Sequence, residues 1–198
     1  MGIQLRQQDL KRIEQHGAQA YPNECCGALL GREQDGCRVV TDILGLNNSR
    51  EGTSDVPKGS PEIMDLLRNA YQLLQVIKNK DRITRDWLER ADLVLNSARN
   101  RFRILPEDFL RSDREAARRG VNLLGFYHSH PDHPARPSQY DREHLLCPWY
   151  TTYLILSVQN GAAGELTGWT LSDDHLDFKW DEISVLGNTE AENDKGAS

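Results

Sequence analysis

Two histidines separated by a single residue lie in the segment with the most potential for chemistry, GFYHSHPDHPARPSQYDREHL. His128 and His130 end an apolar run, residues 121–130, that predicts a buried strand. Side chains alternate along a strand, so both imidazoles project from one face, which we expect them to share with Leu124 and Phe126. Two imidazoles at the end of a strand, followed by a proline-rich turn, are well placed to converge on one metal ion.

A third ligand must come from nearby, and Asp141 is the candidate. It lies on the first turn of a short helix that we expect to open at Ser138. Zinc is bound by imidazole nitrogen and carboxylate oxygen, and a catalytic zinc site keeps three protein ligands. The Ser138-x-x-Asp141 spacing has a second interpretation, because a capping serine with an acidic residue three positions later resembles a capping box. Each pattern is a weak signal alone, whereas the combination favours a metal site.

A single carboxylate upstream, Glu24, precedes an apolar run that predicts a strand beside the histidine strand. A carboxylate within hydrogen-bond reach of a reacting water can act as a general base. Without the downstream motif, Glu24 would be interpreted as a solvated turn residue after Pro22. The neighbouring Cys25 and Cys26 are interpreted as small packed thiols and not as nucleophiles.

The segment from His128 to Asp141, with Ser138 three residues before the aspartate, resembles the signature of the JAMM (MPN-plus, JAB-domain) zinc metallopeptidases. The segment Asn23-Glu24-Cys25-Cys26-Gly27 resembles the one that carries that family's catalytic glutamate. The resemblance is closest to bacterial single-domain JAB peptidases and covers residues 5–48 and 101–182.

The resemblance implies one Zn²⁺ held by His128, His130 and Asp141, with Glu24 activating water and Ser138 donating to the oxyanion. It implies hydrolysis of a peptide or isopeptide bond at the C-terminus of a ubiquitin-like or sulfur-carrier protein. It also implies an α/β fold with a mixed, curved sheet and flanking helices, of the type shared with cytidine deaminases.

The elements that must position these residues follow from hydrophobic periodicity and turn signals. We expect helices over 7–20 and from Pro106 to Gly120. We expect strands over 3–5, 24–32, 37–44, 101–105, 121–130, 150–158, 165–172 and 176–185. Turns at Asp35-Gly36 and Asn160-Gly161 are hairpin signals.

The chain departs from compact JAB peptidases at about residues 50–100. Two amphipathic patterns there, with Leu66 and Leu74 in the first and Trp87 and Val94 in the second, predict an inserted αα-hairpin. We expect residues 1–186 to form one domain containing this insertion, and residues 187–198 to form a disordered polar tail. The apolar faces of the insertion are expected either to be a packing decoration or to mediate dimerisation or substrate gating.

Composition narrows the function classes. The chain of 198 residues has a formal net charge of −6, which does not favour nucleic acid as a partner. No apolar run is long enough to cross a bilayer, and the polar N-terminus lacks the apolar stretch of a signal peptide, so we expect a cytoplasmic protein without a membrane partner. The four cysteines form no CxxC pair.

Two alternatives to the peptidase were weighed. Many MPN-type domains have lost ligands and serve as protein-binding scaffolds, but here all five motif positions are filled. A zinc deaminase needs a Pro-Cys-x-x-Cys ligand pair. Cys147-Pro148 has the reverse order and no second cysteine follows, so a deaminase is excluded.

Overall fold

The computed structural model describes residues 2–48, 69–70, 88, 101–138, 140–141, 152–171 and 178–187. Its helices and strands in chain order are β1 Gly2–Arg6, α1 Gln7–Ala20, β2 Cys26–Gln34, β3 Cys37–Leu46, α4 Pro106–Arg118, β4 Asn122–Pro131, β5 Thr152–Gln159, β6 Ala162–Leu171, β7 Phe178–Asp181 and β8 Ile183–Leu186.

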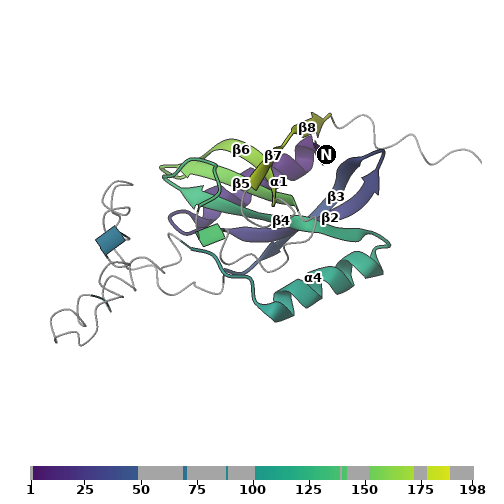
Figure 1. Ribbon diagram of the computed structural model, residues 1–198, viewed down its shortest axis with the longest axis horizontal. Coiled ribbons are helices and arrows are strands. Elements are labelled where there is room, and N and C mark those ends of the chain that lie inside the picture. Colours follow the sequence, from purple (N-terminus) through teal and green to yellow (C-terminus); the bar gives the residue numbers. More distant parts are fainter. Residues whose placement is uncertain are drawn as a thin grey trace, which may run out of the picture.

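The strands form one mixed sheet of eight strands in the order β7-β6-β5-β4-β2-β3-β1-β8 (Figure 1). Three of its strand pairs, β1–β3, β1–β8 and β4–β5, are parallel. The edge strands β7 and β8 are separated in the chain by Glu182 alone. The two edges must therefore approach each other, and the sheet is curved until it is nearly barrel-like.

A buried polar cluster joins strands on the two sides of this curve. Arg38 on β3 is 2% exposed, and its Nη1 lies 3.1 Å from Oδ2 of Asp181 on β7. The same guanidinium donates to the hydroxyl of Thr152, the first residue of β5. Charged groups are buried only with partners, so this cluster fixes how the sheet closes.

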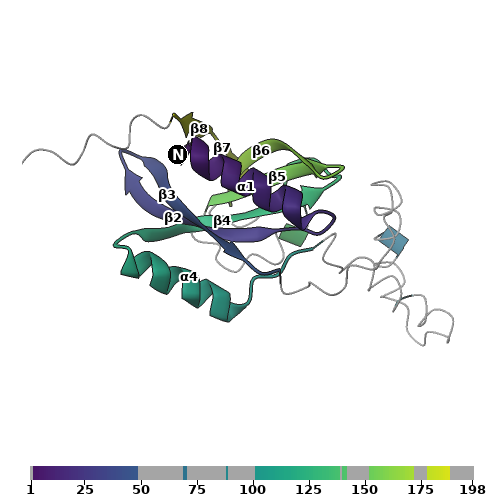
Figure 2. The ribbon, with the colours of Figure 1, turned by 180° about the vertical axis from the view of Figure 1, so that it is seen from behind.

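Helices cover opposite faces of the sheet. Helix α1 packs on one face through Ile13 (Figure 2). Helix α4 covers the other face through Ala116, next to Phe126 and Cys26. The α/β class with a curved sheet and flanking helices is confirmed.

Both predicted hairpin turns are present. Asp35 and Gly36 have φ values of 51° and 75°, and Asn160 and Gly161 have 51° and 83°. Two successive positive φ angles define the turn that matches the twist of paired strands. These turns join β2 to β3 and β5 to β6.

A register shift between Leu29 and Leu30 separates two residues that we expected to share a face. Gly125 pairs with Leu29 and Leu123 with Leu30, so Leu124 is the extra residue of a β-bulge. Phe126 lies in the α4-side core as predicted, whereas Leu124 lies in the α1-side core. The prediction that Leu124 shares the face of the histidines was wrong.

Two predicted strands differ from the structure. Residues 101–105 are in no strand, because the backbone of Arg101 and Arg103 bonds to the side chain of Asn48 instead of to a ladder. The run 176–185 contains two strands, β7 and β8, broken at Glu182, whose carbonyl accepts a hydrogen bond from the N–H of Ile3.

Most of the predicted insertion lies outside the described residues. Within it, the structure describes Asn69, Ala70 and Leu88, which are helical. The tail 188–198 also lies outside. Among the described residues, no helix is long and apolar enough to cross a membrane.

Candidate metal centre

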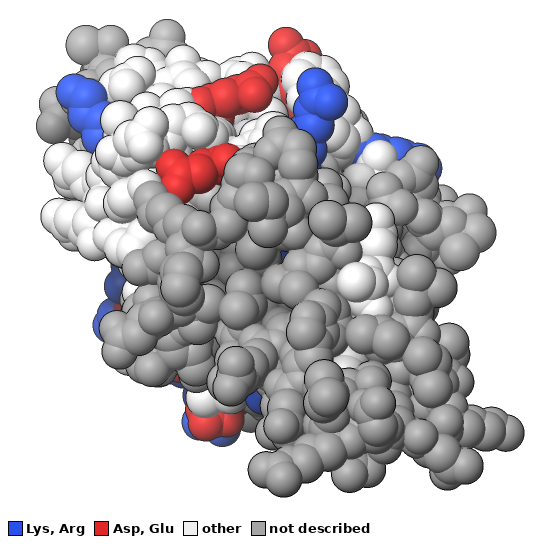
Figure 3. Space-filling view, turned by 90° about the vertical axis from the view of Figure 1, so that its left-hand side faces the viewer, with Lys and Arg blue, Asp and Glu red and all other residues white. Residues whose placement is uncertain are grey.

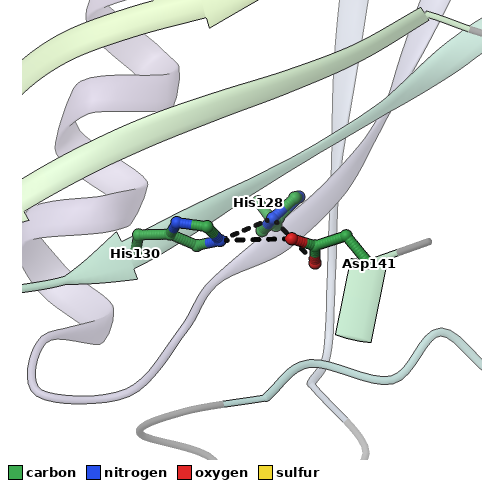
Figure 4. A group of neighbouring side chains, drawn as sticks. All are labelled: His128, His130 and Asp141. Carbon is green, nitrogen blue, oxygen red and sulfur yellow. Dashed lines mark hydrogen bonds and ion pairs between the residues drawn. The ribbon is translucent and has the colours of Figure 1, made fainter. Parts of the chain in front are cut away.

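The two histidines lie at the end of β4, which is flanked in the sheet by β2 and β5. His128 is 1% exposed and His130 8%. Their Nε2 atoms face each other 3.0 Å apart (Figure 4). The structure thus brings the two predicted imidazole ligands together on one face of the strand.

Asp141 completes the group from a short helical segment after the β4 turn. Its Oδ1 lies 3.4 Å from Nε2 of His128, and its Oδ2 lies 3.7 Å from Nε2 of His130. All three side chains are buried, and one ligand atom of each lies within 4.8 Å of the others. No other group of this kind is found within the described part of the chain.

The capping box expected as an alternative is also present. The N–H of Ser138 donates to Oδ2 of Asp141 at 2.5 Å, and the N–H of Asp141 donates to Oγ of Ser138 at 3.3 Å. The same carboxylate therefore caps the helix and faces the histidines. Capping and ligation do not compete, because an ionised carboxylate offers about four lone-pair sites.

The environment of Asp141 favours its ionised form. Burial raises the pKa of this carboxyl, but the neighbouring His128 and His130 and the hydrogen bonds from Ser138 outweigh burial and hold the pKa below its usual value. A carboxylate that stays ionised is the form that ligates a metal.

The tautomer of His130 follows from the hydrogen bond that its Nδ1 makes. Nδ1 lies 3.0 Å from the carbonyl oxygen of Pro134, and a carbonyl can only accept. In the neutral ring, Nδ1 then carries the proton and Nε2 presents its lone pair, which is the usual arrangement of a metal-bound histidine.

The turn that supplies this carbonyl is held by β5 and β6. Oγ of Ser157 donates to the carbonyl of His133 at 2.7 Å. Oγ1 of Thr167 donates to the carbonyl of Ala135 at 2.5 Å. The backbone on both sides of Pro134 is thereby fixed.

His128 is kept neutral by its surroundings. Its ring stacks on Phe102, with centroids 4.3 Å apart and planes at 23°. Burial lowers the pKa of His128 to about 3, and the proximity of His130 adds to this while Asp141 opposes it. A neutral imidazole is the ligating form.

The residues present fit a zinc ion. Ligand atoms of a tetrahedral zinc with bonds of about 2.0–2.1 Å stand roughly 3.3 Å apart. The two Nε2 atoms are 3.0 Å apart, and those of His128 and His130 lie 3.4 and 3.7 Å from Oδ1 and Oδ2 of Asp141, close to that value. Two neutral imidazoles and one carboxylate are also the donor set that catalytic zinc uses.

Glu24 lies two residues before the start of β2 and is 7% exposed. Cys26 pairs with His128 in antiparallel register, and the N–H of Ser129 donates to the carbonyl of Cys25, so the backbone next to Glu24 runs along β4. The carbonyl of Glu24 accepts a hydrogen bond from Nδ2 of Asn48 at 3.0 Å. Glu24 is therefore buried beside the ligand strand and is not the solvated turn residue of the alternative interpretation.

Comparison with known proteins adds to this geometry. Residues 6–172 match the family described as prokaryotic homologs of the JAB domain. The chain belongs to this family. JAB domains include zinc peptidases and also non-catalytic members, so membership alone does not assign an activity to this chain.

Solved structures resemble this chain over nearly its whole length. A protein from Desulfitobacterium hafniense is 24% identical with a TM-score of 0.63, and the match covers 95% of each chain. A protein from Salinibacter ruber is 29% identical with a TM-score of 0.57, covering 96% of this chain and 94% of the other. A JAB1/MPN domain protein from Archaeoglobus fulgidus is 14% identical with a TM-score of 0.44, covering 94% and 99%. No curated protein matches the chain in sequence.

Several contacts in this JAB domain were missed by sequence reasoning. Phe102 covers His128, Asn48 bonds to Glu24, and a main-chain carbonyl orients His130. A carbonyl has no sequence signal. Asn48 and Phe102 stand on either side of the long predicted insertion. That position is the only feature of the sequence that could have pointed to them.

The two cysteines next to Glu24 are packed as expected. Cys25 and Cys26 are buried thiols, and burial raises the pKa of Cys25 to about 11, which disfavours the nucleophilic thiolate. His144 and Cys147 lie outside the described residues. On the described part of the face in Figure 3, acidic and basic side chains lie interspersed, without one continuous patch of either sign.

Proposed function

We propose that this JAB domain is a zinc-dependent hydrolase that cleaves a peptide or isopeptide bond. The observation that carries the proposal is the convergence of His128, His130 and Asp141 into one buried donor group. A scaffold that had lost its activity would have no need to keep two imidazoles and a carboxylate facing one another. We assign the remaining role in a hydrolytic site, that of the general base, to Glu24, which is buried.

Each residue of the proposed site has a separate role in the hydrolysis. A zinc ion bound here would lower the pKa of a water molecule and polarise the scissile carbonyl. Glu24 takes the proton of the attacking water and delivers it to the leaving amine. The Ser138 hydroxyl accepts from the N–H of Asp141, which leaves its own proton available for the developing oxyanion.

The substrate proposed for this site is the C-terminus of a small ubiquitin-fold or sulfur-carrier protein, or of its conjugate. The proposal is supported by the motif resemblance and by the family match over residues 6–172. The alternative is a non-catalytic MPN-type scaffold that binds such a partner without cleaving it.

Cleavage of a panel of ubiquitin-fold carriers with short C-terminal extensions tests the proposal. Intact-mass spectrometry would detect the released extension, comparing the wild-type chain with Glu24→Gln. The glutamine keeps the shape and removes the basicity, so we expect turnover to fall by about two to four powers of ten, with zinc and fold retained. Equal rates for both chains would assign the base to another residue. A wild-type chain that binds a carrier and cleaves none would support the scaffold.

A further inference from the structure

Ser129, between the two histidines, faces the opposite side of β4 and is 0% exposed. Its N–H donates to the carbonyl of Cys25 at 3.1 Å. Its hydroxyl accepts the N–H of Cys25 at 2.8 Å. The last β2–β4 pair is Cys26 and His128. At the next residue, Cys25, the N–H is therefore bound by the Ser129 hydroxyl and not by a backbone carbonyl of the neighbouring strand.

Asn48 makes a second set of contacts beside the same residues and is 2% exposed. Its Nδ2 donates to the carbonyl of Glu24 and to that of Arg101, both at 3.0 Å. Its Oδ1 accepts the N–H of Arg103 at 3.2 Å. One buried amide thus joins the backbone before β2 to the chain on both sides of residues 49–100.

These two side chains hold the same peptide group. The carbonyl of Glu24 and the N–H of Cys25 belong to one planar unit. Asn48 binds its oxygen and Ser129 binds its hydrogen. That plane contains the Cα of Glu24, so holding it restricts where the Glu24 side chain leaves the backbone.

We propose that Ser129 and Asn48 are positioning residues that clamp the Glu24–Cys25 peptide and so aim the Glu24 carboxylate at the metal centre. The inference rests on the proposed function, in which Glu24 is the general base. A base acts only within hydrogen-bond reach of its proton, and a misplacement of about 1 Å can cost roughly 100-fold in rate. Because Ser129 lies between two ligands, the clamp ties the base directly to the strand that holds the metal.

A purely structural role is the competing explanation, since any buried polar group needs a partner. Ser112 provides the matched control. It is also 0% exposed, and its hydroxyl makes one 2.8 Å hydrogen bond, to the carbonyl of Asp108 in α4. Ser112→Ala and Ser129→Ala therefore remove the same group from equally buried positions, one distant from the site and one at the clamp.

Kinetics of the zinc-loaded full-length chain separate the two roles. We expect Ser129→Ala and Asn48→Ala each to lower kcat by about 10- to 100-fold, with KM and zinc content near wild type. Ser129→Thr keeps the hydroxyl and should restore kcat. Ser112→Ala should lower the melting temperature without lowering kcat. The double variant should lose less than the product of the single losses, because both act on one peptide group.

Amide hydrogen exchange gives a readout that needs no substrate. In Ser129→Ala the Cys25 amide loses its acceptor, so its exchange should accelerate by about tenfold or more relative to that of Leu29 in the same strand. If the wild-type chain cleaves no substrate, the proposed function fails, and exchange at Cys25 still decides whether the clamp exists. Unchanged exchange at Cys25, or unchanged kcat in both single variants, would overturn the inference.

Discussion

At the scale of single residues, the site depends on side chains that serve two purposes. Asp141 caps a helix through Ser138 and faces both histidines. His130 presents Nε2 because the Pro134 carbonyl occupies its Nδ1. The sequence pattern alone left the capping box and the ligand as alternatives, whereas the structure shows both sets of contacts in one carboxylate.

The two members of the capping box should respond differently to substitution. Asp141→Ala removes a proposed ligand, so we expect zinc affinity to fall strongly. Ser138→Ala removes a cap and an oxyanion donor, so we expect a loss of about 1 kcal/mol in stability and about 10²- to 10³-fold in turnover, with zinc retained. Chelator competition and steady-state kinetics measure the two effects. Normal zinc binding in both variants, with earlier melting only, would leave Asp141 as a cap alone.

The stability of the metal-free chain should depend on pH through His128. Its pKa is about 3 in the folded chain and about 6.5 when unfolded. Between these values the unfolded chain binds the extra proton, so the free energy of unfolding rises with pH, by up to about 1.4 kcal/mol per unit from this group. Denaturant titrations of chelator-treated protein should show a shallower pH dependence in His128→Gln. An identical slope in that variant would contradict a buried neutral His128.

At the scale of elements, strands β5 and β6 support the turn that orients His130. Thr167 on β6 donates to the carbonyl of Ala135 and accepts from Nε1 of Trp169. Outer contacts of this kind typically change metal affinity by about 10- to 100-fold when lost. The turn is therefore part of the metal centre although it supplies no ligand.

Thr167→Val tests that support, because it keeps the side-chain shape and removes the hydroxyl. We expect zinc affinity to fall by about tenfold, the lower end of the range for such contacts, measured by chelator competition. Thr41→Val on β3 is the control, since its hydroxyl lies 3.5 Å from the Leu30 carbonyl and bonds to no part of the turn. Equal zinc affinities in the two variants would show that the turn does not depend on Thr167.

The sequence predicted most elements because their signals are local. The Asp35-Gly36 and Asn160-Gly161 turns carry the residue types that positive φ requires. The failures have non-local causes. The backbone of residues 101–105 bonds to Asn48, more than fifty positions away in the chain, and the β4 bulge at Leu124 is visible only in its register with β2.

The candidate site shows the same difference between residues with a local sequence signal and residues whose contacts are long-range. Side chains with a fixed spacing, such as His128, His130 and Asp141, were identified by type and interval. Asn48 and the Pro134 carbonyl were not, because their contacts depend on how distant segments pack. Ser129 lies between the two histidines in the sequence. Its hydrogen bond to Cys25 joins residues more than one hundred positions apart, so the neighbouring sequence does not predict it.

At the scale of the whole molecule, Asn48 and Arg101 stand at the two ends of the segment 49–100, most of which lies outside the described residues. Nδ2 of Asn48 lies 3.0 Å from the carbonyl of Arg101, so the two ends of the intervening segment are adjacent. Phe102 follows at once and covers His128. The residues that flank this segment are thus next to the proposed site.

Replacing residues 50–99 with a short Gly-Ser bridge should leave zinc bound, because no proposed ligand lies within that segment. We expect the deletion to change either the mass measured by light scattering or the preference among carrier substrates. If both the mass and the substrate preference stay as in the full chain, the segment is a packing decoration.

The zinc content of the purified chain tests the central claim most directly. Elemental analysis of the wild-type protein and of the His128→Ala, His130→Ala double variant, each after dialysis against a weak chelator, gives the stoichiometry. We expect one zinc per wild-type chain and none in the variant, because the variant lacks both imidazole ligands even if it still folds. Wild-type protein that holds no zinc, or a variant that holds as much as the wild type, would contradict it.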